Sequence, residues 1–403
     1  MVFDFDVLEE TLPIEGIDGT LGATEQSPSS SSKSSRNQTS AKSSKDGEQV
    51  IELFKLLRSS GPSGAHAEAT TWRQLDRDLC TAALPHINPE DEWRELSARR
   101  WNVARLEETA KYFQRHAYGL VSVICPTTAR RRPYHRLLFE CFRSQNYELK
   151  ELVIIETCEE PASEFWLEMS RAYTDILYRH FPVPEDSWSV GLKRNLACCF
   201  ATGTIIAHFD DDDLYAPCYL LEMAQRISEP PPHDELVCDS PEHFSKTQSV
   251  EEALGSYGAG CVKLASWLKF SVQYNMWFMC DPSQDTRLEA GKHVEKCLFG
   301  WGFSYVYLRS AWIMCPFPHI QLGEDYSFLM GIRSLGFPVL LVRGASKICA
   351  HTQHGKNTSG RFMELSEPLA MADAVLAKCP LAPLLARYRQ TVQDSQADER
   401  AQK

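Results

Sequence analysis

From residue 119 onward, short apolar runs alternate with segments of helical periodicity. The apolar runs are rich in β-branched residues and each is followed by polar positions, which is typical of buried strands. Strands are therefore predicted at residues 120–125, 151–156 and 203–207. Helices are predicted after Pro133 and over residues 165–181 and 191–203. This order predicts a parallel sheet joined by crossover helices, an α/β fold.

Residues 1–118 have a different pattern. Serine and lysine dominate residues 22–48, which cannot bury enough apolar surface to offset chain entropy, so we expect residues 1–65 to be mostly disordered. Residues 66–118 are predicted to form a helical extension, with a helix start at Asn88-Pro89. A helical collar packed on the main domain is favoured over a separate docking module.

The apolar pattern in the second half of the chain predicts further strands of the same domain. Residues 262–264 and 267–279 have strand character, and 337–342 is another apolar strand. We place the main domain at residues 119–365. From residue 366 to 403 we expect an amphipathic helix over 368–378, and a polar tail from Gln390.

Composition narrows the class of protein. The 403 residues are 43% apolar, and the formal net charge of −12 disfavours nonspecific binding to nucleic acid. The 14 cysteines are scattered without a paired C-x-x-C, so we expect reduced thiols and a cytoplasmic location. No signal peptide is evident at the first residues, and no uninterrupted apolar run reaches membrane length, so no transmembrane segment is expected.

Four consecutive aspartates, Asp210 to Asp213, follow the strand at 203–207. Ligands of open α/β sheets bind at the carboxyl ends of the strands. Adjacent carboxylates repel, and a hard divalent cation such as Mn²⁺ or Mg²⁺ relieves that repulsion. If the segment is extended, Asp210 and Asp212 share a face and Asp211 points to the other side. A solvated acidic loop is the alternative for an acidic run considered alone.

The predicted helix at 191–203 precedes this strand directly. Gly191 permits a close approach at its start, and Lys193 and Arg194 lie in its first turns. A helix N-terminus combined with basic side chains suits a pyrophosphate group.

Several motifs occur in an order and spacing that resemble the family-two inverting glycosyltransferases of the GT-A fold. They are Val121-Ser122-Val123-Ile124-Cys125-Pro126-Thr127, Ser144-Gln145-x-Tyr147, Gly191-x-x-Arg194-Asn195 and Ala201-x-Gly203-x-Ile205-Ile206-Ala207-x-x-Asp210-x-Asp212-Asp213. The resemblance covers about residues 119–355, with a looser fit over 228–300. It implies a GT-A, Rossmann-like mixed sheet flanked by helices.

The resemblance also implies roles for individual residues. Pro126, Thr127 and Glu156 would line the nucleoside pocket, and Lys193 and Arg194 would lie near the pyrophosphate. Asp210 and Asp212 would be the D-x-D pair that binds donor and metal. One departure is Glu156-Thr157-Cys158-Glu159, where the family usually has an Asp-Asp-Gly-Ser-like turn, which leaves uracil and guanine both open as the nucleobase.

Downstream of the aspartates, Glu324-Asp325 precedes an apolar helix and resembles the family's Glu-Asp motif. The resemblance implies that Asp325 is the catalytic base and that Glu324 orients or binds acceptor hydroxyls. An acid pair favoured by the helix dipole is the structural alternative. His351 and His354 are both candidate metal ligands, because some GT-A enzymes supply a histidine near this point.

These residues predict a metal-dependent inverting glycosyltransferase. It would move one sugar from a nucleotide-diphosphate sugar, most plausibly UDP-linked, to an unidentified hydroxyl acceptor, with Mn²⁺ or Mg²⁺ as cofactor. Gln-x-x-Arg-Trp, the processive synthase signature, is missing after Asp325, which favours transfer of a single sugar. A non-catalytic nucleotide-sugar or glycan-binding protein is the alternative. A nucleotidyltransferase ranks third, because the basic run Arg130–Arg132 has no glycine.

Overall fold

The computed structural model describes residues 54–55, 75, 77–79, 81–112, 118–229, 236–237, 248–272, 274, 276–283, 292–343, 346–354, 357, 366–368 and 381–401. All of them belong to one unit, residues 44–403. Apart from Phe54 and Lys55, the expected disordered tail at 1–65 lies outside the described residues.

The larger sheet has the strand order β3-β2-β1-β4-β10-β7-β11-β6. Its strands are β1 (Val121–Thr128), β2 (Lys150–Thr157), β3 (Ile176–Phe181), β4 (Ile205–His208), β6 (Leu236–Val237), β7 (Cys261–Leu264), β10 (Val306–Leu308) and β11 (Val339–Val342). Strands β1 to β4 run parallel, whereas β10 is antiparallel to both β4 and β7. The sheet is therefore mixed.

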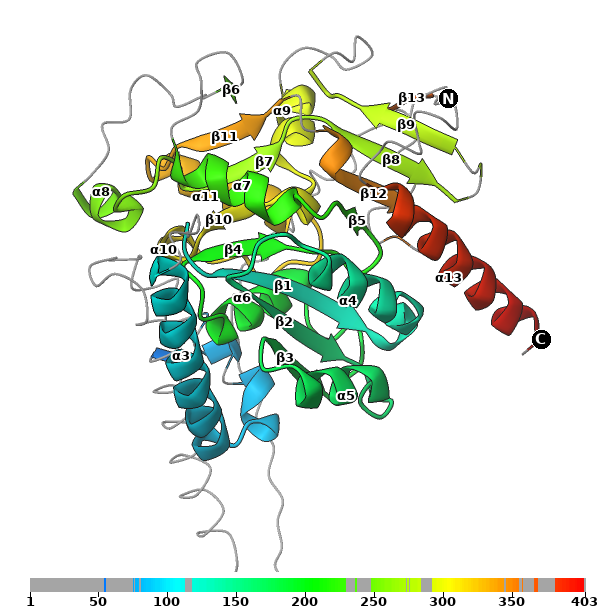
Figure 1. The fold of residues 1–403 in the computed structure, drawn as a ribbon, viewed down its shortest axis with the longest axis horizontal. Helices are drawn as coiled ribbons and strands as arrows, with labels where there is room; N and C mark the ends of the chain where they lie inside the picture. The colour runs from blue at the N-terminus through cyan, green and yellow to red at the C-terminus, as the bar shows by residue number, and fades with distance from the viewer. Residues whose placement is uncertain are drawn as a thin grey trace, which may run out of the picture. The chain divides into compact units, whose positions relative to one another are not determined.

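Helices cover this sheet (Figure 1). They are α3 (Pro89–Tyr112), α4 (His135–Arg143), α5 (Glu164–Ala172), α6 (Val190–Phe200), α7 (Tyr219–Ser228), α8 (Gln248–Leu254), α9 (Lys292–Phe299), α10 (Arg309–Met314), α11 (Glu324–Ser334) and α13 (Ala382–Ala401). Short 3-10 turns are η2 (Leu84–His86), η3 (Ala129–Tyr134), η4 (Gly302–Ser304) and η5 (Ser346–Ile348). The predicted GT-A-like mixed sheet flanked by helices is confirmed.

A smaller sheet has the order β13-β9-β8-β12-β5. Its strands are β5 (Leu214–Tyr215), β8 (Trp267–Ser271), β9 (Met276–Cys280), β12 (Cys349–Gln353) and β13 (Ser366–Pro368). Strand β5 follows the acidic run directly and pairs with β12, which carries His351. The small sheet therefore brings the region of residues 349–354 to the end of β4.

The parallel register aligns the polar ends of the strands. Thr127 of β1 lies opposite Glu156 of β2, and Ile124 of β1 lies opposite His208, the last residue of β4. The strand interiors are buried on both faces, which is why these runs are continuously apolar rather than alternating. The polar residues at their carboxyl ends meet along one edge.

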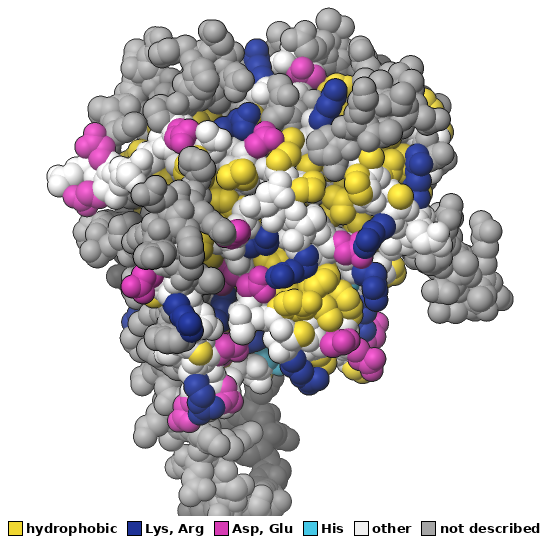
Figure 2. All heavy atoms as spheres, viewed as in Figure 1, with side chains coloured by type: hydrophobic (Ala, Val, Ile, Leu, Met, Phe, Trp, Pro, Cys, Tyr) yellow, Lys and Arg dark blue, Asp and Glu magenta, His cyan; other side chains and the backbone are white. Residues whose placement is uncertain are grey.

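Helix α3 begins at Pro89, as the sequence predicts, and the side chain of Asn88 accepts a hydrogen bond from the backbone N–H of Glu90 at 3.2 Å. Arg99 of this helix pairs with Glu151 of β2 at 2.5 Å, and Glu92 pairs with Arg179 of β3 at 2.8 Å. The helix is thus packed against the sheet, as expected of a collar. Acidic and basic side chains are interspersed over the face that Figure 2 shows.

Two predicted elements are wrong in part. The helix expected at 165–181 ends at Ala172, and residues 176–181 form strand β3, because Ile-Leu-Tyr followed by Phe181 packs as a buried strand beside β2. In the C-terminal region, Pro368 ends strand β13 and residues 382–401 continue as helix α13, where a polar tail was expected from Gln390. Residues 369–378 of the expected helix lie outside the described residues. Among the helices described, none is long and apolar enough to cross a bilayer.

Candidate active site

The four aspartates form a turn, and this corrects the extended conformation that the sequence predicted. Strand β4 ends at His208, and the backbone N–H of Asp213 donates to the carbonyl of Asp210 at 3.3 Å. A turn of this kind is favoured because aspartate tolerates turn conformations and the chain must enter β5 at once. The alternation of faces between neighbouring aspartates therefore does not hold.

The four carboxylates differ in their exposure. The side chain of Asp210 is 33% exposed, whereas those of Asp211 and Asp213 are 7% and 0% exposed. Burial raises the pKa of Asp210 to about 6. Asp210 is therefore the carboxylate of this group that is most open to a ligand.

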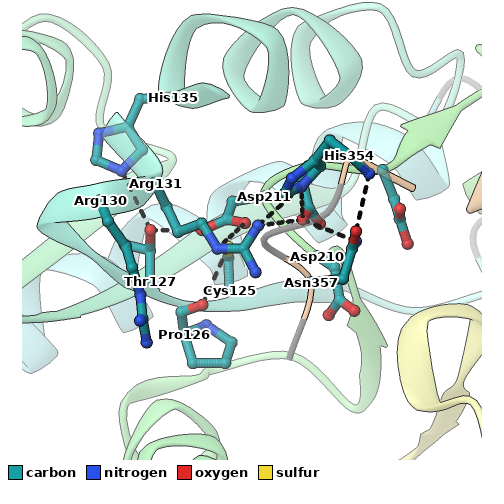
Figure 3. A network of polar contacts seen from close by, with 12 residues as sticks. Cys125, Pro126, Thr127, Arg130, Arg131, His135, Asp210, Asp211, His354 and Asn357 are labelled. Carbon is teal, nitrogen blue, oxygen red and sulfur yellow. Dashed lines mark hydrogen bonds and ion pairs between the residues drawn. The ribbon is translucent and has the colours of Figure 1, made fainter. Parts of the chain in front are cut away.

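Asp211 and Asp212 share one cation, the guanidinium of Arg131 on η3 (Figure 3). Arg131 donates to Asp212, and its Nε lies 3.9 Å from an oxygen of Asp211. Burial raises the pKa of Asp211 to about 7. Burial acts in the same direction on Asp212, but Arg131 and His354 outweigh it and lower the pKa of Asp212 below its ordinary value. Neighbouring acids of one turn thus favour opposite protonation states.

The two candidate histidines contact different aspartates. His354 Nε2 lies 2.7 Å from Asp212 Oδ2, and His351 Nδ1 lies 3.0 Å from Asp213 Oδ2. Asp213 also accepts the backbone N–H of Thr352 at 2.8 Å. His354 therefore belongs to the same corner as Asp212, while His351 anchors the turn to β12.

The ends of β1 and β2 supply the next polar groups. Thr127 donates its hydroxyl to Asp211 at 2.6 Å, and the ring of His135 lies 3.2 Å from the same hydroxyl. Burial lowers the pKa of His135 to about 4, so this imidazole is neutral near pH 7. Pro126 precedes Thr127 and is half-buried.

Glu156 at the end of β2 is fully buried and its carboxylate is already engaged. Arg132 Nε donates to it at 2.9 Å, the backbone N–H of Ser163 donates at 3.2 Å, and the hydroxyl of Tyr178 donates as well. A nucleobase that contacts this carboxylate would have to share it with Arg132.

Helix α6 places two basic residues, Lys193 and Arg194, at this edge of the sheet. Ser189 caps the helix by accepting the backbone N–H of Leu192 at 3.1 Å. The ammonium of Lys193 lies 3.2 Å from the hydroxyl of Thr157, and burial lowers the pKa of Lys193 to about 8. Arg194 donates to Glu324 and lies 3.8 Å from Asp210.

Glu324 and Asp325 begin helix α11 in different surroundings. Glu324 is buried against Arg194, and burial raises the pKa of Glu324 to about 7. Asp325 accepts backbone N–H groups from Gly302 and Tyr326, each at 2.7 Å. A Cβ at position 302 would lie 2.9 Å from the Cβ of Asp325, so glycine permits this close approach.

The donor atoms at Asp212 and His354 suit a divalent cation. Carboxylate oxygens are typical ligands of Mg²⁺ and Mn²⁺, and an imidazole nitrogen shifts preference toward the later, softer metal, here Mn²⁺. Glu156, Cys158 and His180 are a second group of close ligand atoms within the described part of the chain, all within 4.8 Å of one another. Arg132 already donates to two of these three, which supplies a positive charge there.

Three contributors were missed by the sequence patterns. Arg131 was seen only as part of a basic run, Gly302 had no motif, and His208 was given no role. His208 Nδ1 lies 2.9 Å from the carbonyl of Gly302, which links the end of β4 to the glycine beside Asp325. The signal for Arg131 was available, because a basic residue directly after a strand end lies at the ligand-binding edge.

The structure combines a mixed sheet with acids at the end of β4 and an acid pair at the start of α11. Residues 122–279 match the family model described as Glycosyl transferase family 2. Residues 122–279 are thus similar to a family 2 glycosyltransferase domain. The family resemblance expected from the motifs is confirmed.

Comparisons with other proteins add little beyond this match. No curated protein matches the chain. The structure of residues 1–349 of TarS from S. aureus in complex with UDP is similar over 58% of this chain and 60% of that chain, with 15% identity and a TM-score of 0.39. The structure of the mannosyltransferase PcManGT from Pyrobaculum calidifontis, in complex with GDP-Man and Mn²⁺, is similar over 77% of this chain and 86% of that chain. The identity is 13% and the TM-score is 0.40. The chain thus spans less than two thirds of the TarS fragment, and similarity this low carries no argument about donor or metal.

Proposed function

We propose that the chain transfers a single sugar from a nucleotide-diphosphate sugar to a hydroxyl acceptor with inversion at the anomeric carbon. The observation that carries this proposal is the bridge made by Arg194. Its guanidinium contacts Glu324 and lies 3.8 Å from Asp210, so the acidic turn and the acid pair of α11 face one site. Inverting transfer needs these two sides, one for the leaving diphosphate and one for the base.

Asp325 is the base in this mechanism, and Glu324 orients or binds the acceptor hydroxyl. Glu324 is held by Arg194 in a buried ion pair, whereas Asp325 is half-buried and is oriented by two backbone N–H groups at 2.7 Å. The acceptor oxygen attacks the anomeric carbon and gives its proton to Asp325. The bond between that carbon and the diphosphate oxygen breaks, and its electron pair leaves with the nucleotide.

The donor side uses residues at the ends of β1, β2 and β4. Pro126, Thr127 and Glu156 line the nucleoside end, Lys193 and Arg194 lie toward the diphosphate, and Asp210 is open enough to accept a sugar hydroxyl. UDP sugars are the first donors to test, because a carboxylate at the end of β2 can accept the imide N–H of uracil. Guanine offers a comparable N–H, so GDP sugars are the second class of donors to test.

Asp212 and His354 would hold Mn²⁺ or Mg²⁺, with Asp210 and His351 nearby, because their oxygen and nitrogen atoms suit such an ion. When bound, the ion neutralises charge on the leaving diphosphate. The chain's own residues orient the ligands: Asn357 donates to Asp212 at 3.4 Å, and Thr352 donates to the backbone carbonyl of Asp212.

A donor-hydrolysis assay with UDP and GDP sugars, with and without manganese, tests the proposal. We expect manganese to stimulate the release of one nucleoside diphosphate. We also expect the anomeric configuration of a captured product, measured by NMR, to be opposite to that of the donor. Retention of configuration would contradict the role of Asp325. We also propose a cytosolic location, because the cysteines are scattered along the sequence without a paired C-x-x-C.

A further inference from the structure

Arg131 lies where a divalent cation is expected. Its Nη1 donates to Asp212 and lies 3.0 Å from Nε2 of His354, and its Nε lies 3.9 Å from Asp211 (Figure 3). The side chain is only 14% exposed, so this contact is enclosed rather than a loose surface pair. A positive charge that belongs to the chain therefore lies between the atoms that suit a metal.

Arg131 and a metal cannot both use these atoms as they stand. Oδ2 of Asp212 faces Arg131 and His354 together, with Asn357 at 3.4 Å. Arg131 can only donate hydrogen bonds, so its Nη1 points a proton toward the Asp212 oxygen whose lone pair a metal needs. A metal bound there would also lie beside a fixed like charge, which is unfavourable at short range.

A displaced Arg131 would need another anion. A buried guanidinium without a partner is costly, and Arg131 belongs to η3, directly after the β1 end that carries Thr127. A nucleoside diphosphate arriving at this edge offers phosphate oxygens, which match the planar fork of an arginine better than a single carboxylate oxygen does. The same residue can therefore serve Asp212 in the free protein and the diphosphate in the complex.

We propose that Arg131 is a built-in counter-ion of the metal site, which the divalent cation displaces from Asp212 and which then binds the donor diphosphate. This inference rests on the proposed function. It has a quantitative consequence: metal and diphosphate bind weakly alone and strengthen each other. The metal releases Arg131 from Asp212, and the diphosphate supplies the anion with which the released Arg131 pairs. The factor by which Mn²⁺ strengthens UDP binding equals the factor by which UDP strengthens Mn²⁺ binding.

The neighbouring residue provides a matched control. Arg130 is 55% exposed and pairs with Glu185 at 3.0 Å and Asp186 at 3.6 Å rather than with the four aspartates of the acidic turn. Arg130→Ala removes the same charge from the same turn without touching Asp212. Arg131→Gln is the second test variant, because it keeps a hydrogen-bond donor but removes the charge.

The experiment measures Mn²⁺ binding to the full chain by electron paramagnetic resonance of the free ion, without nucleotide and with UDP, and UDP binding by calorimetry. Without nucleotide, we expect Arg131→Ala and Arg131→Gln to bind Mn²⁺ about tenfold more tightly than the wild type, and Arg130→Ala to match the wild type. The coupling between Mn²⁺ and UDP should shrink in both Arg131 variants. Thermal melts establish that each variant is folded.

The outcomes separate this inference from the proposed function. Unchanged or weaker Mn²⁺ binding in a folded Arg131 variant, with UDP binding intact in the wild type, would overturn the role of Arg131 alone. Equal gains in the Arg130 and Arg131 variants would also overturn it, since they would reflect net charge. If the wild type bound neither UDP nor GDP with or without Mn²⁺, the proposed function itself would fail.

Discussion

A buried glutamate, Glu151, and the four aspartates of the acidic turn lie at opposite ends of the parallel strands, and they are stabilised in different ways. Glu151, near the start of β2, accepts hydrogen bonds from the hydroxyl of Ser122 at 2.6 Å, from Thr202 and from Arg99. The single carboxylate of Glu151 therefore has one arginine and three further hydrogen-bond donors. At the other end, four aspartates share two arginines and two histidines.

The difference appears in the protonation of the two sets. Burial would raise the pKa of Glu151, but Arg99 and the hydroxyl and amide donors outweigh it and lower that pKa. In the acidic turn, burial outweighs the nearby positive charge at Asp211 and raises its pKa to about 7, while the pKa of Asp212 is lowered. A fully compensated carboxylate suits a structural role, whereas the acidic turn is compensated unevenly, and an added cation would supply further positive charge there.

The largest expected effect is on stability, at the structural end. Arg99→Ala leaves Glu151 buried without its cation, and breaking such a pair costs about 3–5 kcal/mol of unfolding free energy. Chemical denaturation measures this loss, and turnover per folded molecule should change little. Arg94→Ala is the control. The side chains of Arg94 and its partner Asp91 are 78% and 63% exposed, so this pair should contribute less than about 1 kcal/mol to the unfolding free energy. Equal losses in the two variants would contradict the comparison.

At the functional end, the largest effect is expected on catalysis. Asp325→Asn keeps the size of the side chain but cannot accept a proton as a base. We expect turnover to fall by roughly a hundredfold or more, with UDP affinity little changed. Steady-state kinetics and calorimetry measure the two quantities. Turnover near that of the wild type would move the base elsewhere, with Glu324 the first candidate.

Much of this arrangement was predictable from the sequence. The strands at 121–128, 150–157 and 205–208 follow from apolar runs, and the helix start at Pro89 follows from its Asn88 cap. The motifs that resemble family 2 led to the same fold. These features are local, because a pattern of a few residues determines each of them.

Contacts between distant residues were not predictable. Arg131 and His354 are 223 residues apart and meet only because β5 pairs with β12. The acidic run was expected to be extended, but the close entry into β5 makes it a turn. Strand β3 was predicted as the end of a helix, since Ile176–Phe181 has apolar spacing that suits either element until β2 lies beside it.

The turn changes what is expected of single aspartate variants. Asp212→Ala should weaken UDP binding in the presence of Mn²⁺ by about tenfold or more, because it removes the carboxylate that faces His354. Asp211→Ala should destabilise the turn, since it removes the carboxylate that accepts the Thr127 hydroxyl and part of the anchor of Arg131. We expect Asp211→Ala to lower the melting temperature and to leave the stimulation of UDP binding by Mn²⁺ partly intact.

Titrations of UDP with and without Mn²⁺, together with thermal melts, distinguish the two aspartate variants. If both lost the metal stimulation completely, Asp211 would be a metal ligand as well, and the division of roles within the turn would be wrong. If both variants kept the full stimulation of UDP binding by Mn²⁺, the metal site would not lie in the turn.

The smallest expected effect concerns pH and Lys193. Burial lowers the pKa of Lys193 to about 8, from an ordinary value above 10. Its ammonium is therefore charged below about pH 8 in the folded protein and loses its proton as pH rises through that value. If Lys193 faces the donor diphosphate, UDP affinity measured with Mg²⁺ should fall a few-fold between about pH 6.5 and about pH 8.5. Lys193→Met should bind UDP more weakly at the lower pH and show a flatter profile, and an unchanged slope in that variant would assign the pH dependence to another group.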